Sequence, residues 1–97
     1  MQKRPNVQIE ILYKEKNEWV LFSKSYAIKT NICSNNIKYL NYYNFGLQHS
    51  VNYFSFKIRL DKKLKTGMRI AQEDGIYQIK KIVHERIFTE LIVVQLL

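Results

Sequence analysis

Strict alternation of apolar and polar side chains near the start of the chain constrains its fold more than any other feature. In residues 7–13, VQIEILY, the odd-numbered positions are apolar, whereas positions 8 and 10 carry Gln and Glu. A period of two residues is typical of a β-strand that buries one of its faces. We therefore expect this segment to be a strand that covers a core with one face.

Two further strands are expected in the first two thirds of the chain. Residues 18–32, EWVLFSKSYAIKTNI, predict a long strand with a bulge near Ser23–Ser25, where the alternation changes face. Residues 51–60, VNYFSFKIRL, predict a third strand. Its expected inward residues are Phe54, Phe56, Ile58 and Leu60, and its expected outward residues are Tyr53, Ser55, Lys57 and Arg59.

The last third of the chain predicts the remaining strands. Strands near 68–72 and 76–84 flank Asp74–Gly75, a pair typical of a tight hairpin turn. Segment 84–90 is expected to turn the chain into a final strand at 91–97, LIVVQLL. The unbroken apolar run of this strand predicts burial on both faces or contact with another subunit. Together these patterns predict one all-β domain over 1–97, a small barrel or sandwich of about six strands.

Residues 33–50 do not fit this pattern. They show no alternation and exceed the usual hairpin loop of about 2–5 residues. Apolar residues recur at three- to four-residue intervals from Ile37 to Leu47, and Ser34 or Asn35 could cap the start of a short helix, with Gly46 at its end. We expect a long inserted loop, partly helical or mobile, between the second and third strands. Insertions of this length in small domains are commonly functional.

An aromatic cluster spans the end of this loop and the strand that follows it. Residues 39–54 hold four tyrosines and two phenylalanines, in a chain of net charge +8. The cluster could stack on the bases of a single-stranded nucleic acid, with contacts from Tyr53, Lys57 and Arg59. It could equally form a protein contact surface, since its aromatics alternate with Asn and Leu more than with Lys or Arg. The absence of a base-recognition motif favours the contact surface.

The sequence offers no set of residues for catalysis or for metal binding. It contains one cysteine, Cys33, and two histidines, His49 and His84, in no recognisable catalytic or zinc-binding arrangement. Paired carboxylates and phosphate-binding glycine loops are also lacking. We therefore expect a protein that is not an enzyme and needs no cofactor. No apolar run approaches the roughly 20 residues that cross a membrane, and no signal peptide is expected.

The order of features resembles one known family. The matching features are an apolar strand ending in arginine (Phe56–Arg59), the segment Thr66–Ile70, a glycine turn leading into an aromatic-centred strand (Gly75–Ile79), and the final apolar run Leu91–Val94. Upstream, Trp19 and Tyr26–Ile28 match the second strand of the same family. The chain thus resembles the phage head–tail joining proteins, also called head-closure, head-completion or stopper proteins, of long-tailed double-stranded DNA bacteriophages and prophages.

This resemblance implies a fold, a function and a set of partners. The fold would be a six-stranded antiparallel β-barrel, and copies of it would form a ring below the portal. The ring would contact the connector (adaptor) protein and the tail-completion protein, and the long loop would help close the channel that holds packaged double-stranded DNA. The expected channel and assembly residues of that loop are Ile37, Lys38, Tyr39, Leu40, Tyr42, Tyr43 and Phe45.

The expected location is therefore the neck of the virion, after assembly in the host cytoplasm. The alternative function is a small OB-like or SH3-like barrel that binds single-stranded nucleic acid through Tyr53, Lys57 and Arg59. These two functions use the same barrel differently. In the first, the aromatic residues contact other proteins, whereas in the second they stack on bases.

Overall fold

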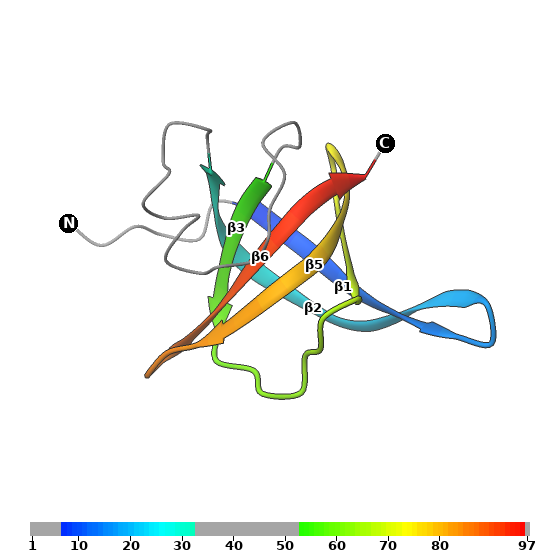
Figure 1. Ribbon diagram of the computed structural model, residues 1–97, viewed down its shortest axis with the longest axis horizontal. Helices are drawn as coiled ribbons and strands as arrows, with labels where there is room; N and C mark the ends of the chain where they lie inside the picture. The colour runs from blue at the N-terminus through cyan, green and yellow to red at the C-terminus, as the bar shows by residue number, and fades with distance from the viewer. Residues whose placement is uncertain (1–6, 33–52, 97) are drawn as a thin grey trace.

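Six antiparallel strands close into a barrel (Figure 1). The computed structural model describes residues 7–32 and 53–96. The strands are β1 (Val7–Glu15), β2 (Glu18–Ile32), β3 (Tyr53–Arg59), β4 (Arg69–Gln72), β5 (Gly75–His84) and β6 (Phe88–Leu96). Their order around the barrel is β1-β2-β3-β6-β5-β4. The expected all-β, six-stranded antiparallel barrel is thus confirmed, while the expected form of loop 33–50 lies outside the described residues.

The turn between β1 and β2 is tighter than the polar segment 14–18 suggests. The strands continue to Glu15 and Glu18, which pair with each other, so the turn itself is Lys16 and Asn17. Both turn residues have positive φ angles, 50° and 70°. Two consecutive left-handed residues are the signature of a type I′ turn, whose twist matches that of the flanking strands.

The bulge of β2 lies one residue before its predicted position. Ile11 pairs with Ser23 and Leu12 pairs with Leu21, so Phe22 is the additional residue on β2. Its ring packs edge-on against Tyr13, with the ring centroids 5.9 Å apart. A bulge in this part of β2 was expected, and the extra residue is Phe22, next to the predicted Ser23–Ser25.

Two more turns differ from their expected positions. The β4–β5 turn consists of Glu73 and Asp74, because Gln72 already pairs with Gly75. Gly75 has a φ of 159°, and a Cβ there would lie 2.9 Å from the side-chain nitrogen Nε2 of Gln95. The strand β6 begins at Phe88, before the expected 91, because the Glu85 N–H donates to the Phe88 carbonyl at 2.8 Å and closes a short hairpin.

The barrel interior forms the hydrophobic core. Its largest fully buried side chains come from β1, β3, β4, β5 and β6: Ile9, Ile11, Phe56, Ile70, Tyr77, Ile79, Leu91 and Val93. Leu64 and Met68, in the connection between β3 and β4, join the same cluster. Full burial of one such side chain contributes roughly 1.5–3 kcal/mol, so this cluster is the main source of stability.

The outer face of β3 and β6 is buried as well. Leu91 to Val94 are 0–7% exposed, which confirms the expected burial of this run on both faces. On β3, however, Tyr53 (6%) and Ser55 (3%) are buried although they were expected to face outward into solvent. Ser55 pairs with Ile92 and donates a 2.6 Å hydrogen bond to Glu90, which is buried as well.

Candidate functional site

The predicted nucleic-acid contacts lie together on the outer face of β3. Tyr53, Lys57 and Arg59 alternate with inward residues, as expected of one strand face. Tyr53 is buried, Lys57 is half-buried with its Nζ 5.6 Å from the centroid of the Phe88 ring, and Arg59 is exposed. Among the described residues of β3, this face therefore presents one exposed cation and no exposed aromatic ring. Base stacking needs an accessible ring, so this geometry gives it little support.

All seven residues of the predicted channel and assembly loop, from Ile37 to Phe45, lie outside the described residues. Cys33 and His49 lie outside them as well. His84 is described, and its Nδ1 lies 3.1 Å from the hydroxyl oxygen of buried Thr89. The roles of the residues from Ile37 to Phe45 in channel closure and assembly stay predictions.

A two-stranded ribbon, here called the hairpin arm (residues 13–22), extends beyond the barrel (Figure 1). It extends because β1 pairs with β4 only over residues 10–12, and β2 pairs with β3 only over residues 28–32. Sequence analysis identified the strands of this arm but not the projection, which depends on the lengths of the neighbouring strands.

Strand β2 exposes large apolar side chains, both within the hairpin arm and just beyond it. Leu21 is 47% exposed, Phe22 is 37% exposed, and Tyr26, on β2 beyond the arm, is 64% exposed. A projecting ribbon with unpaired edges and apolar side chains is a common means of contact between proteins. This is the feature of the described chain best suited to assembly.

The direction of the arm is set by a contact between Trp19, near its turn, and the barrel, and its shape by an aromatic contact within the arm. The guanidinium of Arg69, on β4, lies 4.2 Å from the centroid of the Trp19 ring. Such a cation–π contact contributes about 0.5–1 kcal/mol at exposed sites. On the other face, the Tyr13 ring packs against Phe22, and the Tyr13 hydroxyl donates to Glu15 at 2.9 Å. The arm is therefore positioned by the barrel and presents its apolar residues in one orientation.

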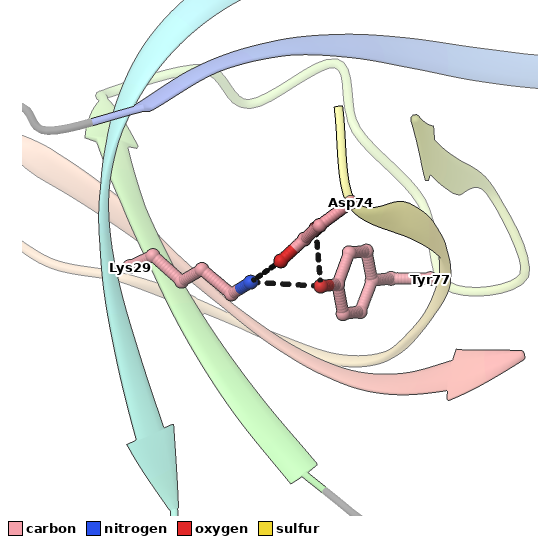
Figure 2. A network of polar contacts seen from close by, with 3 residues as sticks. All are labelled: Lys29, Asp74 and Tyr77. Carbon is pink, nitrogen blue, oxygen red and sulfur yellow. Dashed lines mark hydrogen bonds and ion pairs between the residues drawn. The ribbon is translucent and has the colours of Figure 1, made fainter. Parts of the chain in front are cut away.

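A polar network lies at one end of the barrel interior (Figure 2). Lys29 extends from β2 and donates to Asp74 Oδ2 and to the Tyr77 hydroxyl, both at 2.8 Å. The Tyr77 hydroxyl in turn donates to Asp74 Oδ1 at 2.9 Å. The Lys29 ammonium also lies 4.8 Å from the centroid of the Phe54 ring and 5.0 Å from that of Tyr77.

The electrostatics of this network keep each group in its ordinary charge state. Burial alone lowers the pKa of Lys29, but the hydrogen bonds to Asp74 and Tyr77 outweigh it and the pKa is raised. The hydrogen bond from Lys29, and then that from Tyr77, lowers the pKa of Asp74. Burial raises the pKa of Tyr77. The hydrogen bonds of the network join β2 to the β4–β5 turn and to β5.

The sequence pattern does not indicate this network. A lysine within an alternating strand is expected to face solvent, and only the pairing of Lys29 with Phe56 shows that its position faces inward. Asp74 was assigned to a turn and Tyr77 to a strand, with no indication that either contacts β2. The residues are 45 and 48 positions from Lys29, and no local pattern records contacts over that distance.

Three further searches, for a metal site and a membrane-spanning helix among the described residues and for related proteins, found no match. Within residues 7–32 and 53–96, no cluster of three or more His, Cys, Asp or Glu side chains could hold a metal ion. The same residues include no helix long and apolar enough to span a membrane. No protein-family model matches the chain, and a search of curated proteins gives no match. Among the described residues, the hairpin arm is the candidate contact surface, because it projects and exposes Leu21 and Phe22.

Proposed function

We propose that the chain is a structural, non-enzymatic virion subunit that joins the head of a long-tailed phage or prophage to its tail. Copies would assemble into a ring below the portal, between the connector (adaptor) protein and the tail-completion protein. Packaged double-stranded DNA would occupy the central channel, and the loop at 33–50 would help close it. The subunit would reach the neck of the virion from the host cytoplasm, where assembly takes place.

The observation that carries this proposal is the closure of six strands with one long connection after the second. The resemblance to head–tail joining proteins implies that arrangement. Strands β1 to β6 close into a barrel, and the connection from Ile32 to Tyr53 is the longest between any two consecutive strands. The observed fold thus supports the proposal at the level of architecture.

The hairpin arm supports the assembly part of the proposal. A closed barrel leaves few unpaired edges, so a projecting arm is a suitable point of contact with the neighbouring proteins of an assembly. The arm projects, and Leu21 and Phe22 are exposed on it. Contacts of this kind bury apolar surface that each isolated subunit leaves in water.

Deleting the gene in the phage or prophage that encodes this chain tests the proposal. We expect electron microscopy of the lysate to show separate heads and tails, because both assemble by pathways that do not need the joining ring. A plasmid copy of the gene should restore joined particles. Joined, infectious particles in the absence of the gene would contradict the proposal.

A further inference from the structure

A groove of about 760 Å³ lies between the hairpin arm and the connection from β3 to β4. Its cations are Lys14 on the arm and Lys63 and Lys65 on the connection, and its apolar wall includes Leu21, Phe22 and Met68. All three lysines are exposed. The groove therefore combines positive charge on both sides with an apolar wall.

The three cations have no acidic partner in the part of the chain that the structure describes. The ion pairs described there join Lys24 to Glu10 and Lys29 to Asp74, and neither involves the groove. Three like charges around one groove repel each other unless an anion enters. The charge pattern thus favours an acidic ligand.

The connection that carries Lys63 and Lys65 is fixed in place before any ligand binds. The Gly67 N–H donates to the Ile79 carbonyl at 3.0 Å, and the Ile79 N–H donates to the Met68 carbonyl at 2.9 Å. The Lys63 N–H also donates to Asp61 Oδ1 at 2.9 Å. A ligand would therefore meet a preorganised site and would not have to order this segment, which favours binding.

The arm contributes backbone as well as side chains. From Glu18 to Ala27, β2 pairs with β1 and with no other described strand. Its second edge therefore offers N–H and C=O groups that an extended peptide can use as a neighbouring strand. Leu21 and Phe22 belong to this stretch and also line the groove.

These features of the groove favour a peptide over a single-stranded nucleic acid as its ligand. Bases stack on open, flat aromatic faces. The two rings of the groove, Tyr13 and Phe22, instead pack against each other at 84°, so they do not present a common stacking face. A backbone edge gives hydrogen bonds to a peptide but has no regular counterpart in a nucleic acid. As the occupant of this groove, an acidic segment is also favoured over a second copy of this chain, which carries sixteen Lys and Arg against eight Asp and Glu.

From this geometry we infer that the groove binds an extended, acidic segment of a partner protein, which adds as a strand along β2 and places its carboxylates near Lys14, Lys63 and Lys65. The inference rests on the groove alone and holds whether or not the chain joins heads to tails. It names a partner by its chemistry: a strand with carboxylates on one side and apolar side chains on the other.

The test uses a fluorescein-labelled peptide of alternating glutamate and valine, titrated with the full chain while anisotropy is recorded. We expect binding that weakens as salt is added, and that falls by at least about tenfold in the Lys63→Glu/Lys65→Glu double variant. Both lysines are exposed, so the variant should fold. Amide hydrogen exchange in residues 18–27 should slow when the peptide binds, because the free edge becomes hydrogen-bonded.

Three controls separate specific binding in the groove from a general effect of charge. Lys80 is exposed on β5 and does not line the groove, so Lys80→Glu should leave binding within about twofold of the original chain. Leu21→Ser removes apolar wall without changing charge and should weaken binding by several-fold. A peptide with lysine in place of glutamate should not bind.

Several results would overturn the inference. One is the absence of binding to the alternating peptide, and another is a loss in Lys80→Glu equal to that in the double variant. Unchanged exchange in residues 18–27 on binding would exclude strand addition. An oligothymidylate that binds more tightly than the peptide, and loses binding in the same double variant, would identify the groove as a nucleic-acid site instead.

Discussion

Lys29 holds its positive charge at the end of the barrel, where two hydrogen bonds and three aromatic rings compensate for its burial. Its side chain is 17% exposed, whereas that of its partner Asp74 is 57% exposed. The network therefore lies at the boundary between core and solvent. Hydrogen bonds to charged groups contribute about 1.5–3 kcal/mol in mutational series, and partial exposure reduces that value.

We predict that Lys29→Met lowers the free energy of unfolding by about 1–2 kcal/mol, as measured by chemical denaturation. Met fills a similar volume but leaves Tyr77 and Asp74 without their shared donor. The matched control is Lys24→Met. Its ammonium lies 3.8 Å from Glu10 and both side chains are largely exposed, so its loss should change stability by less than about 0.5 kcal/mol. Equal effects of the two variants would contradict the structural role of the network.

The same network predicts a pH dependence. The pKa of Asp74 is lowered in the folded chain, so its contribution is complete above the ordinary value of 3.8 and is lost as pH falls through the folded-state pKa. The pKa of Lys29 is raised, so its contribution is complete below 10.5 and is lost as pH rises through the folded-state pKa. The stability difference between the original chain and Lys29→Met should therefore be constant near neutral pH and shrink at both extremes.

At the scale of elements, the hairpin arm depends on a turn with one unfavourable residue, Lys16. A type I′ turn requires two left-handed residues, and Lys16 occupies the first of these positions with a φ of 50°. Lysine has a Cβ and no local hydrogen bond to offset the cost, whereas Asn and Gly adopt this conformation readily. The arm therefore forms despite its turn, because Trp19 and Tyr13 anchor it to the barrel and to Phe22.

We predict that the double substitution Lys16→Asn/Asn17→Gly stabilises the chain by about 1 kcal/mol, measured as the free energy of unfolding. The gain comes from the left-handed conformation, so Lys80→Asn, at an exposed position in the interior of β5, should give no gain. A loss of stability in the double variant would show that Lys16 makes a favourable contact that its turn geometry does not reveal.

A second prediction at this scale concerns the long loop. Deleting residues 36–47 should leave the barrel folded, because none of the six strands lies within them. If the proposed function is correct, phage carrying this deletion should package DNA but lose it from filled heads, which nuclease treatment of the lysate would detect. Circular dichroism of the purified variant provides the folding control. Heads that retain their DNA would contradict the role of the loop in closing the channel.

At the scale of the whole molecule, the sequence predicted the strands better than it predicted their surroundings. Alternation in residues 7–13 and 18–32 and the apolar run at 91–97 located β1, β2 and β6, because local period directly reflects which face is buried. Burial of Tyr53 and Ser55 was not predicted. Their neighbours across the sheet, Val94 and Ile92, are distant in sequence, so no local pattern indicates that these two positions are buried.

The candidate sites were predictable only in part. The resemblance and the loop length indicated where to expect assembly residues, but those from Ile37 to Phe45 lie outside the described residues. The groove beside the hairpin arm had no recognisable motif, since Lys14 and Lys63 come together only when β1 pairs with β4. Such sites arise from tertiary contacts, which a single sequence does not record.

In-vitro complementation tests the central claim most directly. Purified chain would be added to a lysate of the gene-deletion phage, and joined particles would be counted by electron microscopy and infectivity. We predict that the chain alone converts separate heads and tails into joined, infectious particles, because it supplies the missing ring. Heads and tails that stay separate, in a lysate that an extract of the original phage does convert, would contradict the claim.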